Sequence, residues 1–242
     1  MLGCNHVTTG MLAGLATLPL APTQTAAGAG VWVLGWAGTA LLPDLDSSGS
    51  SAARMWGTFT RIPAVAIGRL AGGHRWGTHD LFLAPLLCAA VAWLVSLLPV
   101  GQVVVLAVLL GLVLRGLAIT GAGSGLRGPW VNLVLSWVGA WWLAGSAALE
   151  ELTSLIPWVI AGGMIVHILG DALTLSGVPI PLLWLADRRH TWALRLFRTG
   201  GQLELLLLTP ALSIACLIAL YVRADVHQLM TLLTPASSPG PP

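Results

Sequence analysis

Long apolar stretches that are almost free of charge restrict most strongly how this chain can fold. Most approach the length that an α-helix needs to cross a bilayer, roughly 17–25 residues. A soluble domain carries about a quarter charged residues, whereas this chain has 8% charged and 56% hydrophobic residues. Lipid removes the need for a polar surface, and helices satisfy their own backbone groups there. The sequence therefore predicts an all-α fold, a polytopic membrane helical bundle.

Seven stretches are predicted to be the helices of this bundle. They lie near residues 5–20, 27–43, 80–98, 102–120, 130–149, 154–175 and 204–222. The first is the weakest because it is short and carries Pro19. Two longer polar segments, 44–79 and 176–203, connect helices. We expect a single membrane-embedded domain over residues 1–233, followed by a Pro- and Ser-rich tail (234–242) that is disordered by composition.

The arginines predict an orientation for the bundle. If the chain crosses seven times, both long polar segments and the loop 121–129 share one face. That face receives ten of the eleven cations, one of which, Arg115 near the end of the fourth stretch, reaches it by extending its side chain along the helix. The ten are Arg54, Arg61, Arg69, Arg75, Arg115, Arg127, Arg188, Arg189, Arg195 and Arg198. Only Arg223 lies opposite. The positive-inside rule then predicts that this face is cytoplasmic, with the N-terminus inside and the C-terminus outside.

Most histidines and acids fall on the same predicted face. In chain order they are His6, Asp44, Asp46, His74, His79, Asp80, His167, Asp171, Asp187, His190 and Glu204. The opposite face receives only Glu150, Glu151, Asp225 and His227. Several separate segments thus deliver imidazole and carboxylate groups to one side of the bundle, as a metal site with several ligands requires.

The sharpest pair is His167 and Asp171. A spacing of four places both side chains on one face of a helix, one turn apart. Imidazole nitrogen and carboxylate oxygen are ligands of zinc, manganese and iron, and ionisable groups inside a span are functional candidates because they are costly there. The alternative is a structural hydrogen bond between helices.

Asp44 and Asp46 end the second predicted helix. Two acids at a helix C-terminus oppose the macrodipole, which favours a nearby cation, although an Asx turn beside Pro43 would also explain them. The loop His74-Arg75-Trp76-Gly77-Thr78-His79 can bend two imidazoles toward one ion, and Arg75 can bind an anionic group such as phosphate. The alternative for this loop is a solvated turn.

Other chemistries leave no trace in the sequence. Cys4, Cys88 and Cys216 are far apart and form no CxxC motif, which argues against cysteine-based zinc sites and disulfide frameworks. There is no Walker loop, dinucleotide fingerprint or nucleophile elbow. No basic cluster with interleaved aromatic residues occurs, so no nucleic acid partner is expected.

The ordered set of motifs resembles the YdjM-like family of bacterial inner-membrane proteins, which are predicted metal-dependent hydrolases. The motifs are an N-terminal His, then Leu-Leu-Pro-Asp-Leu-Asp, His-Arg-Trp-Gly-Thr-His, and His-x-x-x-Asp-x-x-Thr-x-x-Gly, from His6 to about Glu204. The resemblance implies that the metal-site residues would be His6, Asp44, Asp46, His74, His79, His167 and Asp171. Asp80 is a departure, since such proteins often have Ser after Thr-His; it could add a ligand or cap a helix.

The family is also distantly similar to zinc-dependent phospholipase C and related nucleases, all-helical enzymes with several zinc ions. This similarity implies hydrolysis of a phosphoester. We therefore expect a membrane-bound hydrolase of a phospholipid or lipid-linked phosphate, with a divalent cation, zinc before manganese or iron. Asp46, His79 and Arg75 are the expected catalytic residues, and Glu204 a further metal ligand. The alternatives are a metal-ion carrier or transport accessory protein, and a non-catalytic structural membrane protein.

Overall fold

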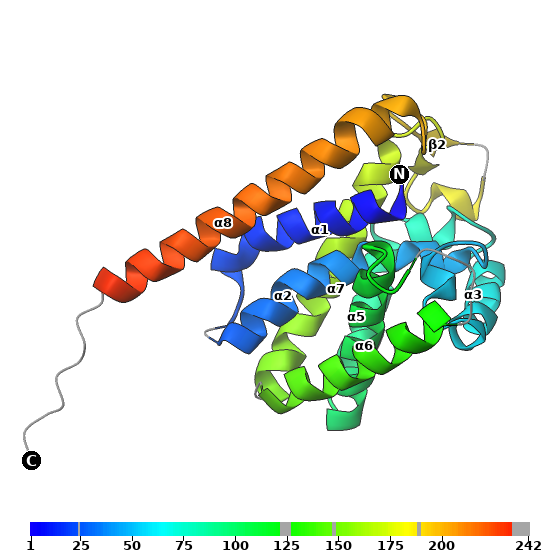
Figure 1. Cartoon of the computed structure of the whole chain (residues 1–242). Helices are drawn as coiled ribbons and strands as arrows, with labels where there is room; N and C mark the ends of the chain where they lie inside the picture. The colour runs from blue at the N-terminus through cyan, green and yellow to red at the C-terminus, as the bar shows by residue number, and fades with distance from the viewer. Residues whose placement is uncertain (24, 122–126, 147–148, 188–189, 234–242) are drawn as a thin grey trace, which may run out of the picture.

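The structure is a computed structural model of the chain (Figure 1). It describes residues 1–23, 25–121, 127–146, 149–187 and 190–233, without the side chains of residues 149 and 224–233. Arg188, Arg189 and the predicted disordered tail lie outside this part. Of the residues predicted on the opposite face, Asp225 and His227 are described by their backbone only. The prediction of one domain over residues 1–233 stays a prediction.

The described residues form eight α-helices, which confirms the predicted all-α class. Their bounds are α1 Gly3–Thr17, α2 Ala26–Thr39, α3 Thr58–Leu70, α4 Leu83–Ser96, α5 Pro99–Gly116, α6 Arg127–Ser146, α7 Leu149–Ala172 and α8 Thr209–Leu233. Seven coincide with the predicted stretches. The eighth, α3, lies inside the segment that we expected to be a polar connection.

Four helical segments in the described part of the chain are long and apolar enough to cross a membrane. They are Ala26–Asp46, Pro99–Gly116, Glu150–Ala172 and Glu204–Arg223. The apolar α4 is shorter. The membrane character of the fold is thus supported, whereas the count of seven crossings stays a prediction.

Short elements complete the described chain. Five 3₁₀ turns span Leu18–Leu20, Pro43–Asp46, Ala52–Arg54, Gly77–His79 and Leu183–Leu185, and a π-helical turn, Glu204–Leu208, leads into α8. A two-stranded antiparallel ribbon pairs β1 (Val178–Pro179) with β2 (Thr191–Trp192). All but the first of these elements lie in the two long polar segments or border them.

Helix α2 occupies the centre of the bundle, where it packs against α1, α5 and α7. Small residues permit this closeness. A side chain at Gly38 would clash with the backbone of α5, and one at Gly163 would clash with Thr39 and with the backbone of α2. The Thr39 hydroxyl also donates a hydrogen bond of 2.6 Å to the Val159 carbonyl. These contacts bring the C-terminal end of α2 against the second half of α7.

The connections alternate between two ends of the bundle, as the predicted parity requires. At one end the Thr25 hydroxyl donates to Glu151 at 2.9 Å. At the other end segment 176–203 contacts Asp80, the residue that follows segment 44–79, because the Trp184 indole donates to Asp80 at 2.8 Å. The N-terminus, α3 and β2 lie together at this second end, on the right of Figure 1.

Candidate metal centre

The predicted site residues converge at the end of the bundle that carries both long polar segments. His6 comes from the first turns of α1, while Asp44 and Asp46 come from the 3₁₀ turn that follows α2. The loop after α3 supplies His74 and His79, and α7 supplies His167 and Asp171. His6, His79, His167 and Asp171 are buried almost completely.

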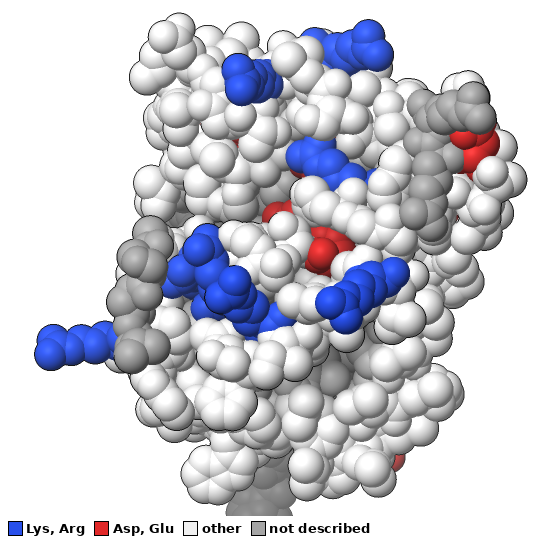
Figure 2. All heavy atoms as spheres, turned by 90° about the vertical axis from the view of Figure 1, so that its right-hand side faces the viewer, with Lys and Arg blue, Asp and Glu red and all other residues white. Residues whose placement is uncertain are grey.

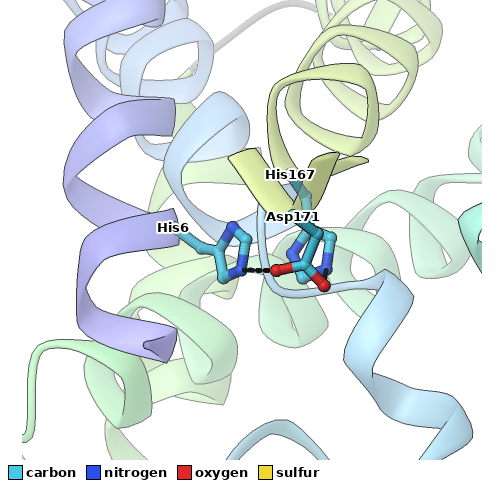
Figure 3. Close-up of side chains that lie close together, drawn as sticks. All are labelled: His6, His167 and Asp171. Atoms are coloured by element: carbon cyan, nitrogen blue, oxygen red, sulfur yellow. Dashed lines mark hydrogen bonds and ion pairs between the residues drawn. The ribbon is translucent and has the colours of Figure 1, made fainter. Parts of the chain in front are cut away.

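His6, His167 and Asp171 point toward one another across the α1–α7 contact (Figure 3). The His6 Nε2 atom lies 3.2 Å from Asp171 Oδ1, and the His6 ring stacks on the His167 ring with centroids 3.7 Å apart. The Nδ1 atom of His6 is buried without a hydrogen-bond partner in the described structure. His6 therefore joins the site through the short first helix, which was the weakest predicted span.

Among the residues that the structure describes, two groups of three side chains could each hold a metal ion. One is His6, His167 and Asp171; the other is Asp44, His79 and His167. Within each group the ligand atoms lie within 4.8 Å of one another. The groups share His167, whose Nε2 lies 3.2 Å from the Nε2 atom of His79.

The protonation of His167 follows from its neighbours. Its Nδ1 atom lies 2.7 Å from the carbonyl oxygen of Ala40, which can only accept a hydrogen bond. The proton of the neutral ring therefore sits on Nδ1. The Nε2 atom is left as a bare acceptor directed at the other site residues.

A similar argument applies to His79. The Thr78 hydroxyl lies 2.5 Å from Asp46 Oδ2 and 3.0 Å from His79 Nδ1. Its one proton goes to the carboxylate, so its oxygen accepts the proton of His79 Nδ1. The Nε2 atom of a neutral His79 is then also a bare acceptor, and it faces His167 Nε2.

The two bare nitrogens also face carboxylate oxygens. Asp171 Oδ2 lies 3.7 Å from His79 Nε2 and 3.9 Å from His167 Nε2, and Asp44 Oδ1 lies 3.9 Å from His167 Nε2. Acceptors that face one another in a buried site are unfavourable unless a proton or a metal cation lies between them. These nitrogen and oxygen ligands, backed by hydrogen bonds to the outer ring nitrogens, fit a divalent metal ion.

Asp46 orients the histidines around this group. Its Oδ1 atom lies 2.6 Å from His74 Nδ1, and its Oδ2 atom accepts from the backbone N–H of Arg75 at 3.0 Å and lies 3.5 Å from His79 Nδ1. The hydrogen bond to Asp46 raises the pKa of His74, and burial offsets only part of this shift. The His74 side chain is 43% exposed, which places a basic imidazole at the mouth of the site.

Arg75 links the buried group to the surface. Its backbone has a φ of 67°, a conformation that non-glycine residues seldom adopt. Its Nη2 atom lies 3.2 Å from Asp171 Oδ2, and its Nη1 atom donates to the Gly177 carbonyl at 3.5 Å. The N-terminal ammonium of Met1 also contacts Asp171. A partly exposed guanidinium therefore lies between the buried carboxylate of Asp171 and the surface.

Glu204 does not belong to either metal-ligand group of the described structure. Its Oε1 atom accepts hydrogen bonds from the Leu2 backbone (2.6 Å) and the Asn5 side chain (2.9 Å), and its Oε2 atom accepts one from the Gly200 backbone (2.7 Å). Both oxygens are thus occupied by N–H donors. These contacts favour a positioning role in which Glu204 ties the start of α1, and with it His6, to the segment before α8.

Asp80 has a structural role. Its Oδ1 atom accepts from the backbone N–H groups of Phe82 and Leu83 at the start of α4, and its Oδ2 atom accepts from Leu182 N and Trp184 Nε1. Burial alone would raise the pKa of Asp80, but the four hydrogen bonds outweigh it and hold the pKa below its ordinary value. Of the two readings of this residue, the contacts favour the helix cap.

Asp187 and His190 form an exposed pair, with His190 Nδ1 3.2 Å from Asp187 Oδ2, and belong to neither metal-ligand group.

Seen from the site end, arginine side chains lie around the middle of the face, where acidic atoms show between them (Figure 2). The sequence did not single out Thr78 or the Ala40 carbonyl, which decide the proton positions. The position of Thr78 next to His79 in the sequence could have pointed to their hydrogen bond. The bond between His167 and the Ala40 carbonyl leaves no sign in the sequence, because every residue has a backbone carbonyl.

A family model extends the resemblance seen in the motifs. The model of the YdjM inner membrane protein family matches residues 1–231. The chain belongs to this family. YdjM membership confirms the resemblance and the inner-membrane character of the chain. No curated protein and no solved structure matches the chain.

Proposed function

We propose that this YdjM-family chain is a membrane-bound metal-dependent hydrolase that acts on a phosphoester carried by a lipid or a lipid-linked molecule. The observation that carries the proposal is that the Nε2 atoms of His79 and His167 face each other at 3.2 Å beside the carboxylate of Asp171, while their Nδ1 atoms are engaged by Thr78 and by the Ala40 carbonyl. A purely structural cluster would be expected to place a hydrogen-bond donor between such acceptors.

The donor set supports a divalent cation of the zinc, manganese or iron type, with zinc as our first choice. His6, His79, His167, Asp44 and Asp171 would hold it. When bound, such an ion lowers the pKa of a water molecule and polarises a phosphoryl oxygen.

Residues of the chain would supply the remaining functions. Asp46 and Thr78 hold His79 in one tautomer and orientation, and the Ala40 carbonyl does the same for His167. The guanidinium of Arg75 would bind a non-bridging phosphoryl oxygen in place of its contact with Asp171. His74, with its raised pKa, would carry a proton at the mouth of the site and could give it to a leaving oxygen.

The arginine-rich end of the bundle would face the cytoplasm. Of the ten arginines predicted there, eight lie in the described part, and those in the segments 44–79 and 176–203 share the end that carries the site. The positive-inside rule favours a cytoplasmic position for this end. The substrate would then be reached from the inner leaflet of the inner membrane.

The test combines metal analysis with a phosphoester screen on purified protein in detergent. We expect the wild type to retain a stoichiometric transition metal and to hydrolyse at least one phospholipid or phosphodiester. His167→Ala should lose metal and activity, whereas His190→Ala, at an exposed histidine outside the site, should keep both. A wild type without metal, or equal metal in both variants, would remove the basis of the proposal. Bound metal without hydrolysis, together with metal flux in vesicles, would favour a carrier instead.

A further inference from the structure

Helix α3 presents an unusual surface for a connection between membrane helices. Its inward residues are small: Thr60 and Ala64 are buried, and Gly68 follows at the same spacing of four. A side chain at Gly68 would clash with the backbone carbonyl of Asp46. The helix therefore lies directly on the 3₁₀ turn that carries two of the site's carboxylates.

The outward face of α3 combines large apolar side chains with cations. The side chains of Phe59, Ile62 and Leu70 are 65%, 67% and 88% exposed. Arg61 and Arg69 are exposed on the same helix, which contains no acidic residue. An amphipathic helix with apolar and arginine side chains on its free surface fits the boundary between lipid tails and phosphate headgroups.

This apolar face continues onto the side of the bundle. The Phe59 ring packs edge-on against Trp130 at the start of α6, with centroids 6.1 Å apart. An apolar groove of about 560 Å³ runs between the two helices, and its lining consists of Trp56, Phe59, Leu133, Val134, Trp137 and Val138. The outer face of α6 is exposed and apolar, as expected of a surface against lipid. A tryptophan at the end of a membrane helix, such as Trp130 at the start of α6, is typical of the membrane interface.

The other side of α3 opens toward the site. An open hollow of about 520 Å³, within the size range of small-molecule pockets, lies between the C-terminal half of α3 and the turn after α2. Its lining consists of Asp46, Ser48, Val65, Gly68, Arg69, Gly72 and Gly73. Consecutive positive φ angles at Gly72 and Gly73 then turn the chain from α3 into His74. Arg69 is thus exposed on α3 and lines the same hollow as the buried Asp46.

We propose that α3 lies in the headgroup layer of the membrane and that Arg69 binds the phosphate of an anionic phospholipid, which enters the hollow from the bilayer. Arg61 would contribute to the preference for an anionic surface, and Phe59 and Ile62 would anchor the helix in the acyl region. The inference rests on the proposed function in one respect: the phosphate held at Arg69 is taken as the group presented to the His/Asp site.

The test is native mass spectrometry of the full chain, as purified, titrated with dihexanoyl-phosphatidylglycerol; it counts intact bound lipid separately from any product. Loss of one charged hydrogen bond should weaken binding by about tenfold or more in Arg69→Gln. The matched control Arg195→Gln changes an exposed arginine outside α3 and should bind like the wild type. Phe59→Ser combined with Ile62→Ser, both at exposed positions, should also weaken binding.

Three results would overturn the inference. One is unchanged affinity in Arg69→Gln. Another is equal affinity for the deacylated headgroup, glycerophosphoglycerol, because the apolar face of α3 would then contribute nothing. The third is a change of oligomeric state in the Phe59/Ile62 variant with lipid binding intact, which would assign α3 to a protein interface. A chain that binds the lipid through Arg69 but hydrolyses no phosphoester would contradict the proposed function alone.

Discussion

Hydrogen bonds outside the metal-ligand groups decide which histidine nitrogens are available to a cation. The Ala40 carbonyl accepts a hydrogen bond from His167 Nδ1, and the Thr78 hydroxyl, which donates to Asp46, accepts one from His79 Nδ1. Such outer contacts fix the tautomer and orientation of a ligating imidazole. At this scale residue type and spacing predicted that His167 and Asp171 lie together, and both belong to a group that could hold a metal ion; their role as ligands stays a prediction. The N–H donors around Glu204 could not be predicted, because nothing in the sequence position of a carboxylate reveals its hydrogen-bond partners.

Thr78 gives the first prediction. Thr78→Val keeps the shape of the side chain but removes the hydroxyl between Asp46 and His79. We expect metal affinity to fall about 10–100-fold, the usual effect of losing an outer contact of a ligand. Competition with a chelator of known affinity measures the change. Thr78→Ser restores the hydroxyl and should bind metal nearly as tightly as the wild type; equal affinities for all three proteins would rule out this role.

Asp80 should affect stability without affecting the metal. In Asp80→Asn the amide nitrogen would face two N–H donors, so we expect a loss of about 1–3 kcal/mol in the free energy of unfolding. Because the folded-state pKa of Asp80 lies below its unfolded value of about 3.9, its stabilising contribution is present above that value. It disappears as the pH falls through the lower folded pKa.

Thermal unfolding of the wild type and of Asp80→Asn in detergent, at several pH values, should therefore show that their stabilities converge in acid. A mutant that loses metal at neutral pH while keeping its stability would instead identify Asp80 as a ligand.

At the scale of elements, the contact between α2 and α7 positions the site. Gly163 lies against Thr39 and the backbone of α2, one helical turn before His167. We expect Gly163→Ala to push the helices apart, to lower stability by about 1–3 kcal/mol and to weaken metal binding by displacing His167 from Ala40. The matched control is Gly30→Ala in α2, where no atom lies within 4 Å of the added carbon.

Gly30→Ala should leave stability unchanged or raise it by up to about 1 kcal/mol, because alanine favours the helix. Thermal unfolding and metal content together measure both variants. Equal behaviour of the two would show that close packing at Gly163 does not support the site.

The sequence predicted helices where a long apolar stretch marks a membrane span, and it did not predict the helix that lacks such a stretch. The apolar stretches predict α2, α5, α7 and α8 because a span needs a long run of such residues. Helix α3 was missed because its inward side is built from small residues and its outward side mixes arginine with apolar residues. Its partner is the turn around Asp46 rather than another helix, and such a contact leaves no periodic signal that distinguishes it from a loop.

At the scale of the whole molecule, alternating connections place the polar segments at one end. The sequence predicted this segregation through the parity of the crossings. The described contacts, Thr25 to Glu151 at one end and Trp184 to Asp80 at the other, agree with it. What the sequence could not provide is the packing of His6 beside α7: a side-chain carbon added at Gly170 would lie 3.5 Å from the His6 ring and only 3.0 Å from the Met1 side chain.

The orientation of the bundle in the membrane can be tested with reporters. We expect a C-terminal alkaline phosphatase fusion to be active and a C-terminal green fluorescent protein fusion to be dark, because the C-terminus should lie outside. A fluorescent C-terminal fusion would contradict the count of seven crossings and the cytoplasmic position of the site.

The most direct test of the account is X-ray absorption at the metal edge of the purified protein. Nε2 coordination by His79 and His167 predicts a nitrogen- and oxygen-ligated ion with the multiple-scattering signature of at least two imidazoles. That signature should be reduced in His79→Ala and in His167→Ala and should be unchanged in His190→Ala. A metal without imidazole ligands, or a spectrum that neither site variant alters, would contradict the central claim that these two facing nitrogens bind a cation.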